Sequence, residues 1–330
     1  MRREGSRVDA ARAAPQPPDL PQDAREIARA VAGQHGVAPS DVVPVPVQGQ
    51  VNLSLLLGDE LVLRLPRTTR AEGLLAKESL VIPLVRDAGL PAPEIISFDT
   101  SLRHASVPYM VLRRARGETL AARPLNRTGR RRTLGALGEI LRALHEIRMQ
   151  RVGPLDALPE PYAFSLPELL DRLVEAGEIG GAQHVWLREQ FERLRPEGPS
   201  LADPVLVHRD VAPSNVMVDG AGEVTALLDW GCAEWGSPAR DLVGLPLEDL
   251  PDLLAGYRTD DGSDLELELE RDALWYHLYL ALARLLKEPS TSEDRNWAAP
   301  RSATLLDLLA LTSGDGKESW PDLLRARSAG

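Results

Sequence analysis

Cysteine is almost absent from this sequence. Its 330 residues include a single cysteine, Cys232. One thiol cannot form an intramolecular disulfide or a cysteine-rich zinc site, so a disulfide-stabilised secreted scaffold is excluded. No apolar run approaches the roughly 20 residues of a membrane-spanning helix, and the first residues lack the apolar segment of a signal peptide. We therefore expect a soluble protein of the cytoplasm.

Positive charge is also in deficit. The chain has 38 lysine and arginine residues against 49 aspartate and glutamate residues, a formal net charge of -11. Because contacts with phosphate backbones need positive faces, this balance argues against a nucleic-acid-binding domain. Hydrophobic residues (43%) and charged residues (26%) are at ordinary globular levels, which excludes wholesale disorder. The length suits one large domain or two modest ones.

Several common catalytic signatures are missing. No Gly-x-Gly-x-x-Gly follows a predicted strand, which argues against a Rossmann dinucleotide site. There is no P-loop, and His145-Glu146 lacks the second histidine of a zinc-protease helix. No Gly-x-Ser-x-Gly elbow of a hydrolase occurs either. Any catalysis must therefore rest on another arrangement of side chains.

Strands dominate the first third of the chain and helices the rest. Two apolar runs, 53–57 and 61–65, flank a Gly58-Asp-Glu turn, which is typical of a hairpin. In the second run alternate leucines share one face, and Arg64 lies on the other. We also predict a strand over 107–112 and helices over about 69–88, 129–148, 166–176, 182–195 and 271–287. This segregation indicates an α+β fold with a small sheet lobe and a larger helical lobe.

Polar residues gather at the ends of short apolar strands between residues 205 and 231. One strand leads to His208-Arg-Asp210, a short loop leads to Asn215, and a later strand ends at Asp229. An aspartate five positions before an asparagine is typical of a kinase catalytic loop. A second aspartate at a strand end suits Mg²⁺ that bridges nucleotide phosphates. The spacing predicts phosphoryl transfer, with Asp210 as the base or orienting group and with Asn215 and Asp229 as metal ligands. The alternative for an isolated aspartate or asparagine is a turn.

The segments His208-Arg-Asp-Val-Ala-Pro-Ser-Asn215 and Asp229-Trp-Gly231 resemble the aminoglycoside phosphotransferase family, which shares the protein-kinase-like fold with choline kinases. The stretch Gly236-Ser-Pro-Ala-Arg-Asp241-Leu extends the likeness, which covers about residues 40–245. The resemblance implies a two-lobed, protein-kinase-like fold. We expect a nucleotide-binding N-lobe at 23–113 and a C-lobe at 114–330 that carries the catalytic loop and the acceptor-binding helices. Residues 1–22, rich in alanine, proline and arginine, are expected to be a flexible tail before them.

The resemblance also implies where a nucleotide binds. Arg64 stands at the basic residue of the third strand, which touches the phosphates in the family, and Glu78 fits the family's helix carboxylate. Glu78 lies on an apolar helical stripe, where a carboxylate removed from water needs a partner, and Arg64 is our proposed partner. The alternative is a glutamate at the helix edge in water.

Two further segments are candidates for nucleotide contacts. Gly49 and Asn52 lie where a loop would cover the nucleotide, although a plain hairpin turn explains them equally well. The segment from Met110 through Leu112 to Arg114 is a candidate hinge, whose backbone could bond a purine edge.

Two residues of the catalytic loop are assigned supporting roles. His208 is expected to be a buried residue that braces the loop, with the role of base as the alternative. Arg209 stands where glycine is commoner in the family, which makes the loop more similar to that of a protein kinase. Arg64, similarly, replaces a frequent lysine, and arginine holds phosphate through a planar fork.

These observations together predict a small-molecule O-phosphotransferase. It would use Mg²⁺ and transfer the γ-phosphate of ATP or GTP to a hydroxyl of an antibiotic of aminoglycoside, macrolide or nucleoside type. The alternatives are a metabolic kinase acting on choline, homoserine or a sugar, and a non-catalytic nucleotide-binding module. An acidic stretch over 248–270 would attract a cationic substrate, unless it is only a solvated loop.

Overall fold

The computed structural model describes residues 22–46, 48–49, 51–147, 165–194, 204–258 and 265–287, with isolated positions near 302–308. The predicted tail of residues 1–22 lies outside this part of the chain, except for Gln22, where the first helix begins. Among the described residues, no helix combines the length and the apolar character needed to cross a membrane.

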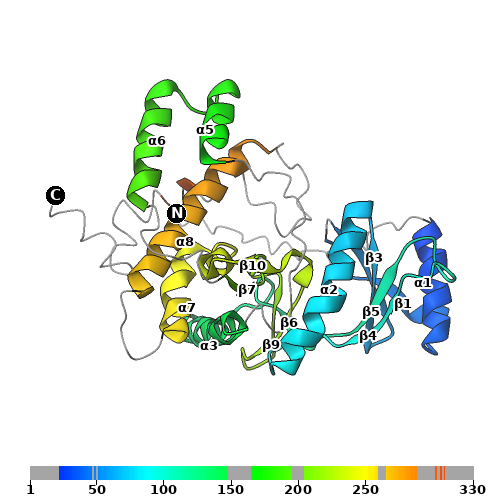
Figure 1. The fold of residues 1–330 in the computed structure, drawn as a ribbon. Helices are drawn as coiled ribbons and strands as arrows, with labels where there is room; N and C mark the ends of the chain where they lie inside the picture. The colour runs from blue at the N-terminus through cyan, green and yellow to red at the C-terminus, as the bar shows by residue number, and fades with distance from the viewer. Residues whose placement is uncertain are drawn as a thin grey trace, which may run out of the picture.

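The chain forms a small lobe built on a sheet and a larger, mainly helical lobe (Figure 1). The sheet is antiparallel, with strand order β1-β2-β3-β5-β4. Its strands and the two helices beside it are β1 (Val42–Pro44), β2 (Asn52–Leu57), β3 (Leu61–Pro66), β4 (Ile95–Asp99), β5 (Tyr109–Arg113), α1 (Gln22–Gln34) and α2 (Thr69–Asp87). The predicted hairpin is confirmed as β2 and β3, whose turn begins at Gly58 with a φ of 61°.

The two faces of this sheet pack against different partners. The alternate leucines of β2 and β3 form one core with α1, on the outer side of the lobe (Figure 1). Arg64 lies on the other face of β3, toward α2, as the alternation of the strand predicts. Thr68 caps the start of α2 by accepting a hydrogen bond from the Ala71 amide, and Gly89, with a φ of 78°, follows its end.

The larger lobe contains five described α-helices and two small sheets, ordered β10-β7 and β6-β8-β9. Short 3₁₀ segments connect several of them: η2 (Trp230–Cys232), η3 (Pro238–Leu242) and η4 (Leu247–Asp249). The helices are α3 (Arg127–His145), α5 (Leu166–Glu175), α6 (Gly181–Leu194), α7 (Leu250–Tyr257) and α8 (Leu265–Leu285). The strands are β6 (Glu118–Thr119), β7 (Val205–Val207), β8 (Val216–Val218), β9 (Val224–Leu227) and β10 (Glu234–Gly236). Helix α8 begins at Leu265, earlier than the predicted residue 271. The prediction missed this start because the opening Leu265-Glu-Leu-Glu-Leu-Glu alternates with a period of two, which is not a helical pattern.

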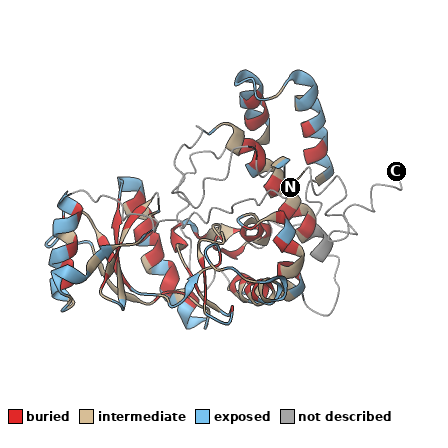
Figure 2. Ribbon diagram, turned by 180° about the vertical axis from the view of Figure 1, so that it is seen from behind, coloured by how far each residue is buried: buried red, intermediate tan, exposed pale blue. Residues whose placement is uncertain are grey.

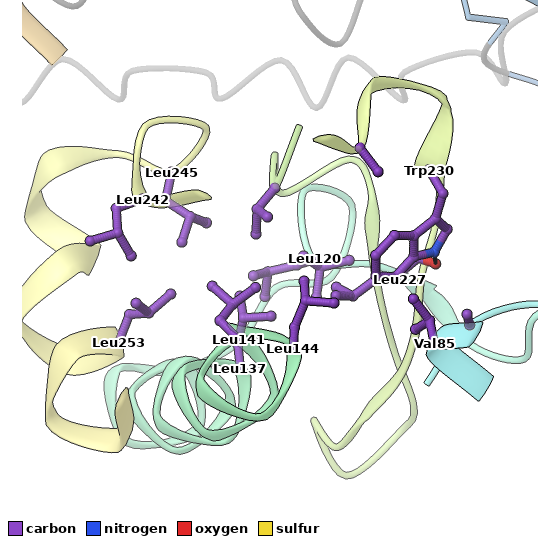
Figure 3. Close-up of a cluster of buried hydrophobic side chains, with 14 of the residues drawn as sticks. Val85, Leu120, Leu137, Leu141, Leu144, Leu227, Trp230, Leu242, Leu245 and Leu253 are labelled. Carbon is purple, nitrogen blue, oxygen red and sulfur yellow. Dashed lines mark hydrogen bonds between the residues drawn. The ribbon is translucent and has the colours of Figure 1, made fainter. Parts of the chain in front are cut away.

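The main core joins α3 to the strands that carry the polar loops. Leu134, Leu137, Leu141 and Leu144 form a fully buried stripe on α3. Figure 3 shows this stripe facing Leu120 and Leu227, with Trp230 beyond them. In the burial view of Figure 2, buried residues are red, and the residues of α3 away from its buried face are intermediate (tan) or exposed (pale blue). The core therefore fixes the strand ends on which the polar residues sit.

Glycines allow α3 and α7 to approach closely. A Cβ atom added to Gly256 of α7 would overlap the backbone carbonyl of Gly135, and one added to Gly138 would overlap the carbonyl of Leu253. Backbone cannot move aside as a flexible side chain can. The two helices thus need glycine at these positions.

We expect Gly256→Ala to destabilise the protein by about 1–3 kcal/mol, the usual cost of overpacking a core. Gly33→Ala is the matched control, because a Cβ at this helical position of α1 meets no other atom within 4 Å. Urea unfolding measures both variants. Equal stability of the two would contradict the proposed close approach of α3 and α7.

Candidate active site

The predicted catalytic loop connects two short strands of the larger lobe. β7 ends at Val207 and β8 begins at Val216, so residues 208–215 join them. The Asn215 Nδ2 donates to the carbonyl oxygen and to the carboxylate Oδ2 of Asp210, at 2.9 Å each. With its amide nitrogen used in this way, Asn215 keeps its oxygen, Oδ1, as the atom that a hard cation would take.

Asp229 lies directly beside this loop. The residue before it, Leu228, donates its backbone N–H to the Asn215 carbonyl at 2.8 Å. Burial, and next to it the charge of Asp229, raise the pKa of Asp210 above the usual range of an aspartate. The structure thus brings Asp210, Asn215 and Asp229 together, as the spacing of the sequence predicts.

His208 is fully buried and both of its ring nitrogens are engaged. Nδ1 accepts the Asp210 backbone N–H at 3.2 Å, and Nε2 lies 3.0 Å from the Leu228 carbonyl oxygen. These contacts suit the neutral ring protonated at Nε2, with no nitrogen left to accept a substrate proton. The ring also packs on Trp230 at a centroid distance of 4.4 Å. The geometry therefore supports bracing of the loop over catalysis by His208.

Asp241 anchors the same loop by accepting hydrogen bonds from its backbone, a role that was not predicted from the sequence. Its buried carboxylate accepts the backbone N–H groups of His208 (2.9 Å) and Arg209 (2.6 Å), and it lies 3.0 Å from His145 Nε2 of α3. Burial alone would raise the pKa of Asp241, but the hydrogen bond and charge of His145 hold it below its usual range. The other nitrogen of His145 lies 2.8 Å from the Tyr257 hydroxyl of α7. The signal that could have identified Asp241 is its place in the Gly236-Ser-Pro-Ala-Arg-Asp stretch.

The predicted ion pair between Arg64 and Glu78 is present. Arg64 Nη1 lies 2.8 and 2.6 Å from the two Glu78 oxygens, and Nη2 donates to Asp229 Oδ1 at 2.9 Å. Glu78 has no exposed surface, and burial raises its pKa to about 8 even though Arg64 opposes this shift. Gly231 packs close to α2. A Cβ atom added at this glycine would lie 3.4 Å from Glu78 Oε1. One guanidinium therefore links the sheet, α2 and the Asp229 loop.

The remaining candidates lie in the sheet of the small lobe. Met110 and Leu112 are buried in β5, each paired with β3 on one side and β4 on the other, so their purine contacts stay a prediction. Gly49 lies in the loop before β2, and Asn52 begins that strand with 3% of its surface exposed. Within the described part of the chain, neither amide atom of the Asn52 side chain has a hydrogen-bond partner, so this buried amide is available to a bound group.

The ligand atoms at the site suit Mg²⁺ held jointly with phosphates. No cluster of three or more His, Cys, Asp or Glu ligands occurs among the residues that the structure describes. Asp229 and Asn215 supply one carboxylate and one amide oxygen, the hard donors that Mg²⁺ takes when phosphates and water complete its shell. The Asp229 side chain keeps 37% of its surface exposed, which leaves it accessible.

Comparison with known proteins identifies the family of the chain. A family model described as the phosphotransferase enzyme family matches residues 41–274, more than half of the chain. The chain belongs to this family.

Solved structures of family enzymes share its fold. The GDP complex of aminoglycoside 2'-phosphotransferase-IIIa has a TM-score of 0.56 and 20% identity, covering 80% of this chain and 89% of that one. A streptomycin-ATP-APH(2")-IIa ternary complex has a TM-score of 0.59 and 15% identity, covering 91% and 99%. Macrolide 2'-phosphotransferase MphH from Brachybacterium faecium has a TM-score of 0.53 and 20% identity, covering 79% and 98%. The predicted α+β, protein-kinase-like fold is therefore confirmed.

Arg209 of this chain belongs to a network of charged side chains with Glu234 and Arg240. Its backbone has a φ of 68°, a region that disfavours side chains with a Cβ atom. Its Nη1 donates to Glu234 Oε2 of β10 at 2.8 Å, and Arg240 binds the other oxygen of Glu234. Burial and the nearby Arg240 lower the pKa of Arg209, so Glu234 is needed between the two guanidinium groups. These contacts hold Arg209, which precedes Asp210.

We expect Asp241→Asn to destabilise the protein by about 3 kcal/mol and to reduce phosphoryl transfer, because buried N–H groups lose their ionic acceptor. Asp252→Asn is the control, since its exposed pairing with Arg131 should contribute about 0.5 kcal/mol or less. Denaturant unfolding at several pH values measures both. The depressed pKa of Asp241 stabilises the fold above about pH 4 and this contribution is lost as the pH falls, so Asp241→Asn should flatten the acid limb.

We expect Glu234→Gln to lower kcat about tenfold while the affinity for nucleotide changes less than about twofold, because the loop before Asp210 loses its anchor. The control is Glu223→Gln, which removes an exposed pairing with Arg132 at 3.1 Å. Steady-state kinetics and nucleotide titration separate the two effects. An unchanged kcat for Glu234→Gln would show that the network does not position Asp210.

Proposed function

We propose that the protein is an antibiotic O-phosphotransferase, which transfers the γ-phosphate of ATP or GTP to a hydroxyl of a small molecule. The observation that carries this proposal is the convergence of Asp210, Asn215 and Asp229 at strand ends, with Arg64 alongside. The arrangement offers a base, two hard metal ligands and a fixed positive charge within one site. Kinase catalysis needs these groups in such proximity, since it depends on positioning and on neutralised phosphate charge.

The residues divide the work as follows. Asp210 accepts the proton of the acceptor hydroxyl while that oxygen forms its bond to the γ-phosphorus and the bond to the bridging β-oxygen breaks. Its raised pKa suits proton transfer better than that of an ordinary aspartate. Asn215 keeps the Asp210 carboxylate oriented through its Nδ2. Asn215 and Asp229 would hold Mg²⁺, which when bound supplies charge neutralisation on the phosphates.

Arg64, from the small lobe, contributes a fixed positive charge beside Asp229. Its guanidinium stays protonated, because Glu78 and Asp229 more than offset the effect of burial on its pKa. Its Nη2 donates to Asp229 Oδ1, and the planar guanidinium is suited to binding phosphate oxygens. Gly49 and Asn52, on the loop before β2, are proposed to cover the nucleotide, with the Asn52 amide as a donor or acceptor.

The experiment is an acceptor screen with labelled ATP and GTP, comparing wild type with Asp210→Ala. We expect Asp210→Ala to lose transfer by at least about 100-fold, because it removes the base, while nucleotide binding remains. Asp87→Ala, an exposed position at the end of α2, is the control and should behave as wild type. Transfer to choline, homoserine or a sugar, with none to antibiotics, would replace this proposal by a metabolic kinase. Full activity of Asp210→Ala would contradict the assigned base.

A further inference from the structure

A cavity of about 610 Å³ lies among α5, α6 and α8, outside the residues discussed so far. Figure 1 shows α5 and α6 standing side by side above α8, away from the sheet lobe. Cavities of this size enclose small organic molecules. The lining residues therefore indicate what kind of molecule fits.

Aromatic and aliphatic side chains form much of this lining. Trp275 is central, with its ring parallel to that of Tyr279 at 5.6 Å and edge-on to Phe191 at 5.3 Å. Tyr276 lies beside it at 5.1 Å, and the buried Leu170 comes from α5. Rings held by one another in this way present a stiff apolar surface, which favours an apolar partner.

The charges of the cavity are nearly balanced. Asp171 and Glu192 face it together with Arg188 and His184. One of the two carboxylates is already engaged, because His184 Nε2 lies 3.2 Å from Asp171 Oδ1. A polycation needs several carboxylates that are not offset by cations, so this lining suits it poorly.

Three carboxylates in the acidic stretch of residues 248–270 are also paired with arginines, which weakens their attraction for a polycation. Within its described part, Asp249 pairs with Arg130, Asp252 with Arg131 and Glu270 with Arg258. These arginines offset the charge that the sequence analysis considered as an attraction for a cationic substrate.

A continuous set of contacts joins the cavity to the catalytic loop. Arg240 lies over the Tyr276 ring, 5.7 Å from its centroid. The same guanidinium binds Glu234, and Glu234 binds Arg209, the neighbour of Asp210. The lining of the cavity is thus connected to the residue before Asp210 through Arg240 and Glu234.

We propose that this cavity binds the apolar part of the phosphate acceptor, and that the acceptor is a ring-bearing alcohol with at most one positive charge, such as a macrolactone. This assignment rests on the proposed function for the transfer step, but the binding itself does not require turnover. It excludes polycationic amino sugars as preferred acceptors. Trp275 supplies the apolar contact, and Arg188 disfavours additional positive charge.

Calorimetric titration of the full chain with erythromycin, a macrolactone with one amino group, and with kanamycin tests the proposal. We expect erythromycin to bind at least about tenfold more tightly than kanamycin, and Trp275→Leu to weaken erythromycin binding about tenfold, as loss of aromatic contact predicts. Tighter binding of kanamycin, or binding of neither compound, overturns the proposal. So does unchanged erythromycin binding by a Trp275→Leu variant that circular dichroism shows to be folded.

A charge reversal provides a second test that does not depend on the core. Arg188 is exposed on α6, so the Arg188→Glu variant should fold. The control is Arg193→Glu, an exposed position on the same helix outside the cavity. Relative to this control, Arg188→Glu should tighten kanamycin binding about tenfold. Equal effects of the two reversals overturn the proposal.

The outcome is separable from that of the proposed function. Asp210→Ala should abolish transfer yet leave erythromycin binding within about twofold. If wild type transfers phosphate to no acceptor while the binding pattern holds, the proposed function fails and the cavity assignment stands. If it transfers phosphate only to polycationic acceptors, the cavity assignment fails and the proposed function stands.

Discussion

The buried carboxylate of Asp241 sets the position of the reacting loop. It accepts the N–H groups of His208 and Arg209 and contacts His145 of the long helix α3. A carboxylate with no exposed surface is stable only when its oxygens are satisfied, so loop and helix are tied to one arrangement. The positive φ of Arg209 is the local cost of presenting both N–H groups to one acceptor. Asp210 lies beside Asn215 because the two residues before it are held in this way.

A second buried charge connects the two lobes. Arg64 comes from the small sheet, Glu78 from α2, and Asp229 from the end of β9 in the larger lobe. Such a link differs from a surface ion pair, because removing one partner leaves a charge buried without compensation. It also means that the carboxylate proposed for Mg²⁺ is oriented from both lobes. If Asp229 holds Mg²⁺ and nucleotide as proposed, their binding would be coupled to the relation between the lobes through one guanidinium.

The family fold alone does not identify the acceptor, because the candidate catalytic residues bind the reacting groups and not the rest of the acceptor molecule. In this chain the described helices α5, α6 and α8 line a cavity beside Trp275, and the charged side chains of that lining are nearly balanced. The solved structures that share this fold include proteins named as an aminoglycoside phosphotransferase and as a macrolide phosphotransferase. Choice between such classes rests on a few side chains outside the catalytic loop, since discrimination is a difference of affinities.

Features that depend on local spacing could be predicted from the amino-acid sequence: the hairpin at Gly58, the leucine stripe of α3 and the pairing of Asp210 with Asn215 in one loop. The sequence also predicted the pair of Arg64 and Glu78, because a carboxylate on an apolar stripe requires a cation. It did not identify β4, or Asp241 as the acceptor of two loop amides, or Glu234 between two arginines. Asp241 is 33 residues from His208, and only packing brings them together. Contacts between distant residues produce no periodic pattern in the sequence, so they become visible only once the chain is folded.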